Sequence, residues 1–145
     1  MAHTFVKDIM KTNVITIDAS RQVIDAAKMM DNANVGCIII TKDSKPVGIL
    51  TERDFVKRIV AQNLPSSTQL SEVMSSPLIS THPGETVWEA AEIMQQKHIH
   101  KVPVEENDKI IGILTATDLV EICSLGSDSN MRNICDQILL RMKDT

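Results

Sequence analysis

The sequence has few aromatic residues, few glycines and no long hydrophobic run. Aromatic residues make up 2% of the 145 residues and tyrosine is absent, which argues against the stacking surfaces on which proteins bind single-stranded nucleic acids. Only 5 residues are glycine and no glycine-rich loop is present, so no P-loop for phosphate is expected. No apolar stretch approaches the roughly 20 residues that a membrane-spanning helix needs.

An excess of charge of one sign is also missing. The formal net charge is -4 at pH 7 and the charged residues are scattered, which excludes the basic surface typical of nucleic-acid-binding proteins. The three cysteines form no C-x-x-C pair, and we interpret them as small buried side chains rather than a disulfide framework. The first ten residues lack the basic-then-apolar layout of a signal peptide. We therefore expect a cytoplasmic protein that binds neither nucleic acid nor membrane.

An internal repeat is the main feature that the sequence does contain. Residues 48–54, Gly-Ile-Leu-Thr-Glu-Arg-Asp, return as residues 112–118, Gly-Ile-Leu-Thr-Ala-Thr-Asp. The offset is 64 residues (112 − 48), and it aligns residues 6–123 without a gap. Other identical pairs at this offset are Met10 and Met74, Ile15 and Ile79, Val23 and Val87, Met30 and Met94, and Lys45 and Lys109. A register kept over this length indicates a duplicated unit.

Each copy predicts the same order of elements, β-α-β-β-α. The first copy is predicted to contain an extended stretch at 14–17, a helix with Ser20 as N-cap, strands at 37–40 and 47–50, and a closing helix at 54–61. In the second copy the extended stretch is at 78–81, the helix has Thr86 as N-cap, the strands are at 102–104 and 110–114, and the closing helix is at 118–124. One copy is too small to bury both faces of its sheet. We therefore predict an α+β fold in which the two copies pack sheet to sheet with pseudo-two-fold symmetry.

The repeat also predicts the division of the chain. Repeat 1 is expected at 1–62, a linker at 63–71, repeat 2 at 72–124, and a C-terminal loop and helix at 125–145. The apolar side chains of that last helix lie on one face at helical spacing, and they are Ile134, Ile138, Leu139 and Met142. We expect this helix to extend a dimer interface or to contact a partner.

The doubled Gly-hydrophobic-x-Thr-x-x-Asp motif, with Met-ended openings and Ala-Ala-x-x-Met helices, resembles the CBS domain. CBS domains occur in pairs, called Bateman modules, in metabolic enzymes, in the gamma subunit of AMP-activated protein kinase and in small stand-alone proteins. The resemblance covers about residues 6–124. It implies a regulatory module for energy or metabolite sensing, without catalytic activity or cofactor, that forms a homodimer and signals to an unknown regulated protein. The implied ligand is AMP, ADP or ATP, or an adenosyl compound such as S-adenosylmethionine.

The resemblance also implies which residues bind the ligand. The motif aspartate accepts hydrogen bonds from the ribose hydroxyls, while the threonine and nearby N–H groups hold phosphate. One predicted site combines Thr51 and Asp54 with Ile79 and with His100-Lys101, with Arg53 either adding charge or remaining solvated; the other combines Thr115 and Asp118 with Ile15 and with Gly36-Cys37. The physical basis is sound, because one carboxylate can accept both hydroxyls and a helix N-terminus favours anions.

The two predicted sites differ in charge. Residues 97–103 resemble the Ile-His-Arg-Leu-Pro stretch that meets phosphate in the kinase gamma subunit, with Lys101 in place of the arginine. The matching residues 34–39 contain no cation. We therefore expect the Asp54 site to hold a phosphate-bearing nucleotide, and the Asp118 site to be empty or to hold a nucleoside-like thioether or sulfonium compound.

Other interpretations of the same residues remain open at this point. Asp54 and Asp118 are also ordinary helix-capping residues, and His98 with His100 is half of a metal site without an evident third ligand; we predict no metal. A protein–protein interaction or dimerisation module with degenerate ligand sites is the alternative function. A small enzyme acting on nucleotides is a third, which the lack of a catalytic motif makes the weakest.

Overall fold

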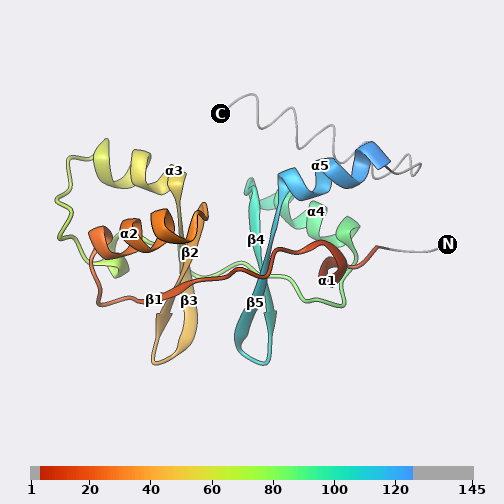
Figure 1. Ribbon diagram of the computed structural model, residues 1–145, viewed down its shortest axis with the longest axis horizontal. Helices are drawn as coiled ribbons and strands as arrows, with labels where there is room; N and C mark the ends of the chain where they lie inside the picture. Colours follow the sequence, from red (N-terminus) through yellow and green to blue (C-terminus); the bar gives the residue numbers. More distant parts are fainter. Residues whose placement is uncertain (1–3, 126–145) are drawn as a thin grey trace. The chain divides into compact units, whose positions relative to one another are not determined.

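The computed structural model describes residues 4–125 and has the α+β fold that the duplicated pattern predicts (Figure 1). The predicted C-terminal helix lies outside the described residues. Between residues 4 and 125, no helix is long and apolar enough to cross a membrane. The chain divides into two compact units, which are described separately below.

The two repeats contain the same elements at the predicted offset. Repeat 1 consists of α1 (Val6–Ile9), β1 (Thr16–Asp18), α2 (Val23–Ala33), β2 (Cys37–Lys42), β3 (Lys45–Thr51), α3 (Glu52–Asp54) and the π-helical η1 (Phe55–Val60). Repeat 2 consists of the 3₁₀ turn η2 (Leu70–Glu72), α4 (Val87–Lys97), β4 (Lys101–Glu106), β5 (Lys109–Thr115) and α5 (Ala116–Leu125). Because α2 and α4, β2 and β4, and β3 and β5 each start 64 residues apart, the duplicated register is confirmed.

The start of α2 differs from the prediction. Gln22, not Ser20, occupies the N-cap position, and the Ser20 hydroxyl instead donates to the Asp18 carboxylate. The backbone takes over the capping role, since the N–H of Val23 donates to the carbonyl oxygen of Thr68 at 2.9 Å. A helix end needs a side-chain cap only where its first N–H groups have no other acceptor, so the prediction of Ser20 as the cap is wrong.

The start of α4 agrees with the prediction. Thr86 is its N-cap, and the Thr86 hydroxyl accepts the N–H of Glu89 at 3.2 Å. Both long helices end at a residue in the left-handed region, Asn34 with φ 54° and His98 with φ 55°. Asn and His are among the non-glycine residues that adopt this region most readily, so the position of His98 is explained by helix termination.

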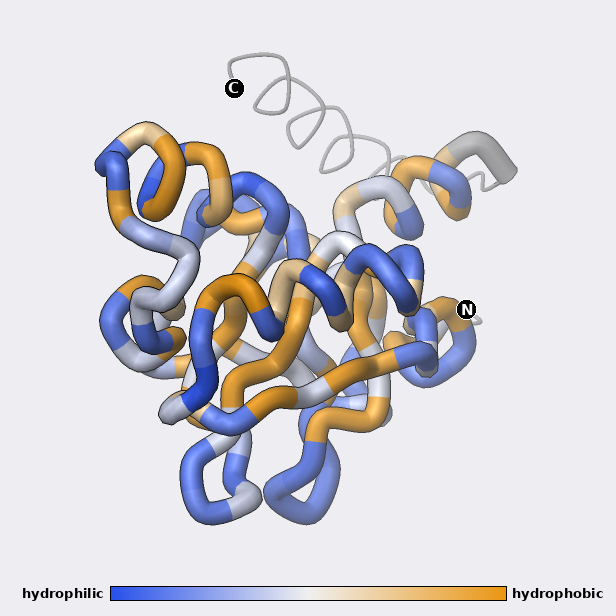
Figure 2. The backbone as a smooth tube through the Cα atoms, turned by 60° about the vertical axis from the view of Figure 1, so that its left-hand side comes forward, coloured by the Kyte–Doolittle hydropathy of each residue, from blue (hydrophilic) through white to orange (hydrophobic). Residues whose placement is uncertain are grey.

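Each strand pair is joined by a two-residue turn. Asp43 and Ser44 have φ of 52° and 64°, and Asn107 and Asp108 have φ of 54° and 61°. Two successive positive φ values are typical of the type I′ turn, whose twist matches that of the flanking strands. Both turns are hydrophilic, whereas the strands they join are largely hydrophobic (Figure 2).

The sheet of repeat 1 has three strands in the order β1-β2-β3, with β1 parallel and β3 antiparallel to β2. The sheet of repeat 2 has only β4 and β5, and the expected strand at 78–81 is reduced to a single parallel bridge between Thr81 and Val104. The reason lies in one residue. In repeat 1 the N–H of Ile39 donates to the carbonyl of Ile15 at 3.0 Å, but the matching Pro103 has no N–H to donate.

Each repeat has its own hydrophobic core. The buried residues of the repeat-1 core are Ile17, Ala19, Val23, Ala26, Met30, Ile38, Ile40, Leu50, Ile59, Leu70 and Val73. Those of the repeat-2 core are Val6, Val87, Ala90, Ala91, Met94, Val102, Val104, Leu114, Ala116 and Leu119. Residues 6–10 and 70–74, which end in the repeated methionine, are the opening segments of the two repeats. Each contributes to the core of the other repeat: Leu70 and Val73 lie in the repeat-1 core, and Val6 lies in the repeat-2 core.

This exchange of opening segments defines the two units. The repeat-1 unit consists of residues 13–79 with 108–110, and the repeat-2 unit contains residues 4–12, 80–107 and 111–125. Val6, with no exposed surface, donates its N–H to Glu85 at 2.8 Å, and Leu70, equally buried, donates its N–H to Arg21 at 2.9 Å. Val6 and Leu70 are 64 residues apart, so the two contacts are equivalent.

The motif glycines provide the space for this exchange. The Cα of Gly48 faces Met74 and the carbonyl oxygen of Ser75, so that an added Cβ would lie 2.8 Å from each. At Gly112 an added Cβ would lie 2.5 Å from the sulfur of Met10. Glycine allows such close approach of two chain segments. In each unit the motif glycine of one repeat therefore packs against the methionine that ends the opening segment of the other repeat.

Candidate functional site

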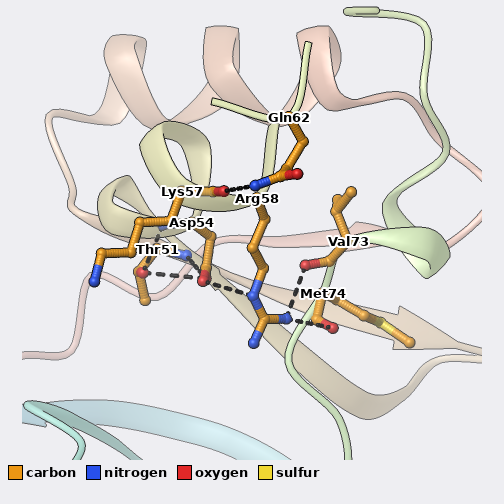
Figure 3. Close-up of polar contacts among 7 residues, drawn as sticks. All are labelled: Thr51, Asp54, Lys57, Arg58, Gln62, Val73 and Met74. Carbon is orange, nitrogen blue, oxygen red and sulfur yellow. Dashed lines mark hydrogen bonds and ion pairs between the residues drawn. The ribbon is translucent and has the colours of Figure 1, made fainter. Parts of the chain in front are cut away.

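Thr51 and Asp54 form a capping box at the end of β3 (Figure 3). Oδ2 of Asp54 accepts the Thr51 N–H at 2.8 Å and the Thr51 hydroxyl at 3.1 Å. The Asp54 N–H in turn donates to the Thr51 hydroxyl at 3.4 Å. This reciprocal arrangement fixes the side chain at the strand-to-helix transition, and it uses Oδ2 while Oδ1 lies outside the box.

Arg58 contacts the remaining oxygen of Asp54. Its Nε lies 3.4 Å from Asp54 Oδ1, and its Nη1 donates to the carbonyl oxygens of Val73 and Met74, each at 3.3 Å. Figure 3 shows the guanidinium between the carboxylate and this backbone segment. Arg58 therefore connects the motif aspartate to the backbone of Val73 and Met74, of which Met74 packs against Gly48, and it acts as a positioning residue for both.

We expect Arg58→Met to lower the free energy of unfolding by about 1 kcal/mol, because the pair is partly exposed and its charge is screened. The side chains of Arg58 and Asp54 are 48% and 14% exposed. Arg53→Met, an exposed position on the same helical segment, is the matched control and should change stability by less than about 0.5 kcal/mol. Urea unfolding of both variants measures the difference, and equal midpoints would show that the bridge contributes nothing.

Thr115 and Asp118 repeat this geometry at the end of β5. Oδ2 of Asp118 accepts the Thr115 N–H at 2.9 Å, and the Asp118 N–H donates to the Thr115 hydroxyl at 3.2 Å. Oδ1 faces a different cation, since Nζ of Lys11 lies 3.7 Å away. The Asp118 side chain is only 6% exposed, whereas Lys11 is 62% exposed, so a buried carboxylate is paired with a solvated lysine.

The closing helices begin two residues earlier than predicted, at Glu52 and Ala116 instead of Asp54 and Asp118. The aspartates therefore occupy the third helical position, from which a carboxylate can reach back to the cap. The capping interpretation of these residues is confirmed in both repeats. It does not exclude ligand binding, because only one oxygen of each carboxylate takes part in the box.

Each motif lies beside the helix-to-strand corner of its own repeat. Glu52 donates its N–H to the carbonyl of Gly36 at 3.1 Å, and Cys37 pairs with Thr51 in the sheet. Ala116 donates its N–H to the carbonyl of His100 at 2.8 Å. The predicted site residues are distributed as follows: Ile15, Gly36, Cys37, Thr51, Arg53, Asp54 and Ile79 are in the repeat-1 unit, and His100, Lys101, Thr115 and Asp118 are in the repeat-2 unit.

Sequence reasoning missed Lys11 and Arg58. Arg58 follows Asp54 by four residues, and this spacing on a helix is a recognisable signal for an ion pair. Lys11 had no such signal, because it reaches Asp118 through the pairing of residues 11 and 113. The matching positions are Ser75 and Ile122, so the two repeats supply their cations from different elements.

The described residues contain no histidine–cysteine cluster suited to a metal. Among residues 4–125, no three His, Cys, Asp or Glu side chains are grouped so that they could hold a metal ion. Cys37 is buried in β2, as the interpretation of the cysteines as core side chains requires. Cys123 is partly buried and packs against the repeat-2 core.

The duplicated motif, the exchanged segments and the matched capping boxes can be compared with known proteins. The CBS domain model matches residues 6–61 and again residues 70–124. The chain belongs to the CBS domain family. It is a tandem CBS pair, and the resemblance drawn from the repeated motif is confirmed.

Relatives of this CBS pair include a protein of similar length. CBS domain-containing protein YhcV of Bacillus subtilis is 33% identical over 134 residues, which cover 91% of this chain and 96% of that protein. The CBS domain pair of protein MJ0100, solved in complex with 5′-methylthioadenosine and S-adenosyl-L-methionine, is 30% identical with a TM-score of 0.76, covering 85% of this chain and 98% of that one. A conserved protein from Pyrococcus horikoshii gives a TM-score of 0.78 at 25% identity, covering 89% and 99%.

Proposed function

We propose that this CBS pair is a non-catalytic regulatory module that binds adenosyl ligands at its two Thr-x-x-Asp motifs. The observation that carries the proposal is the state of the two carboxylates. In both repeats Oδ2 belongs to the capping box, and Oδ1 faces a partly exposed cation, Arg58 or Lys11. Such an oxygen can exchange its cation for the hydroxyls of a ribose, which provide two adjacent donors.

The rest of each motif suits the other parts of an adenosyl compound. Thr115 directly precedes α5, and the dipole of this helix favours an anionic group at its N-terminus. The N–H groups of Ala116 and Asp118 already donate to His100 and Thr115, so the contribution of α5 is mainly that of its dipole. The ligands observed in the MJ0100 pair, 5′-methylthioadenosine and S-adenosyl-L-methionine, share the adenosyl group with AMP, ADP and ATP. That shared group is the part we propose the motifs recognise.

A regulatory module of this kind acts through conformation or assembly. A ligand can shift an equilibrium only if it binds two states with different affinity. In the repeat-1 unit, Arg58 can transmit such a change, because it contacts both Asp54 and the backbone of Val73 and Met74. A ligand that displaces Arg58 from Asp54 alters these contacts with residues 73–74. The resulting change in conformation or assembly is then recognised by a second copy of the chain or by another protein.

A thermal-shift panel tests the proposal. AMP, ADP, ATP, S-adenosylmethionine and methylthioadenosine are compared with GMP on the wild type, Asp54→Asn and Asp118→Asn. Asparagine keeps an oxygen for the capping box and removes the charge that accepts both hydroxyls. A ligand at about 100 times its Kd stabilises the folded state by about 2.7 kcal/mol, so we expect a rise of several degrees that is reduced in each variant and abolished in the double variant.

The control in this panel is the ligand-free melting temperature of each variant, against which its own shift is measured. An equal shift in the wild type and the double variant would place the ligand elsewhere. No shift with any adenosyl compound near millimolar concentration would contradict the proposal.

One observation supports the alternative of an interaction module. Val56 and Val60 are 65% and 74% exposed, and they lie four residues apart on η1 with Leu64, 39% exposed, a further four residues on. Exposed apolar residues that are grouped in this way mark interaction surfaces. A homodimer in light scattering, combined with no thermal shift from any ligand, would favour dimerisation alone; a dimer that also binds ligand fits the main proposal.

A further inference from the structure

Lys11 combines a backbone held by hydrogen bonds with an exposed side chain. Its N–H donates to the carbonyl of Ile113 at 2.9 Å, and its carbonyl accepts the Ile113 N–H at 2.8 Å. Met10, the preceding residue, packs into the space left by Gly112. The side chain beyond this anchor is 62% exposed and reaches the buried Asp118 carboxylate. The lysine therefore cannot leave the motif, while its ammonium group can change partners.

Repeat 1 has the same backbone bridge without the lysine. Ser75 occupies the matching position, and it exchanges hydrogen bonds with Ile49 at 3.1 and 2.9 Å. The cation at Asp54 is Arg58, whose guanidinium is already engaged by the carboxylate and by two carbonyl oxygens. An arginine held in this way has less freedom to turn to a ligand than a solvated lysine on a flexible stem.

We propose that Lys11 is a ligand-binding residue and that it makes the Asp118 motif the site for a phosphate-bearing adenosyl ligand. This inference rests on the proposed function. When the ribose hydroxyls take Oδ1 of Asp118, the ammonium group is released beside the bound ligand, where it neutralises a phosphate. Lys101 begins β4 next to His100, whose carbonyl accepts the first N–H of α5, and it adds a second positive charge to the same unit.

The assignment reverses the expectation from sequence, which gave the phosphate-bearing ligand to the Asp54 site. That expectation used Lys101, with Arg53 as a possible further charge, and did not include Lys11. With both lysines in the unit of Asp118, the charge favours an anionic ligand there. At the Asp54 site, Arg58 is already bound by the carboxylate and by two backbone carbonyl oxygens. That site then suits an adenosyl compound without phosphate.

The test is calorimetric titration with AMP and with adenosine, which differ only by the phosphate. The parent is Asp54→Asn, so that binding reports the Asp118 site, and Lys11→Ser introduces the residue that repeat 1 carries at the matching position. We expect Lys11→Ser to lower the affinity for AMP about tenfold, the effect of one charge-assisted contact. The affinity for adenosine should stay within about twofold of the parent value. Lys11→Arg, which keeps the charge, should retain most of the AMP affinity.

Lys109→Ser is the matched control, because it removes the same charge from an exposed position at the opposite end of β5. It should change neither affinity. An equal loss of affinity for AMP and adenosine would overturn the inference, since Lys11 would then affect binding only by positioning Asp118 and not by contacting the phosphate. An unchanged AMP affinity would overturn it as well. If the parent binds neither compound while the folded state is intact, the proposed function itself fails at this site.

Discussion

Gly48→Ala is expected to lower the free energy of unfolding by about 1–3 kcal/mol, the usual cost of overpacking a tight contact. An added Cβ would lie 2.8 Å from the carbonyl oxygen of Ser75 and 2.8 Å from the sulfur of Met74. The methionine can rotate away, but the carbonyl is held by the hydrogen bonds between Ser75 and Ile49. For a chain of this size the melting temperature should fall by roughly 3–10 °C.

Gly84→Ala is the control for this experiment. No atom lies within 4 Å of a Cβ added at Gly84, and the described glycines have no positive φ. Alanine there should leave stability unchanged or raise it slightly, because it restricts the unfolded chain. Calorimetric melting of the two variants gives the comparison, and equal melting temperatures would show that residues 74–75 are not packed against β3 as the structure has them.

Leu70→Ala is expected to have the largest effect on stability, a loss of about 2–5 kcal/mol. Leu70 lies within the stretch that the sequence predicts as linker, yet it has no exposed surface and belongs to the repeat-1 core. Truncation leaves a cavity that the surrounding side chains fill only in part. A loss of this size is a large fraction of the stability of a typical domain.

Leu64→Ala provides the matched leucine in the same stretch. Leu64 is 39% exposed, so its truncation should cost less than about 1 kcal/mol. Urea denaturation of both variants separates a passive linker from a segment that completes the core. Near-neutral results for both leucines would contradict the exchange of opening segments, whereas a loss confined to Leu70 supports it.

The exchanged segments also connect packing with the proposed sites. Residues 10–11 carry the methionine that fills the space at Gly112 and the lysine that contacts Asp118. Residues 73–74 carry the methionine at Gly48 and the carbonyl oxygens that hold Arg58. A ligand that displaces either cation from its aspartate therefore acts beside a segment that packs against the same motif. This arrangement gives the proposed regulation a physical route within each unit.

The periodic features of the chain could be predicted from the sequence alone. The offset of 64 residues predicted the paired starts of α2 and α4, of β2 and β4, and of β3 and β5, because local preferences and the pattern of apolar residues repeat with it. The left-handed turns at Asp43 and Asn107 and the cap at Thr86 follow from the preferences of single residues. The motif residues Thr51, Asp54, Thr115 and Asp118 were found in the same way, since the doubled motif is a local pattern.

Only the tertiary structure decided the features that depend on contacts between distant segments. Ser20 is not the cap of α2, because the carbonyl of Thr68 satisfies the first helical N–H. Leu70 is buried in the repeat-1 core, because it packs with residues about fifty positions earlier in the chain. Lys11 reaches Asp118 because it forms a backbone bridge with Ile113, which is more than a hundred residues away in the sequence. A sequence pattern records which residues are apolar or charged, but the partner of each is set by the folded backbone.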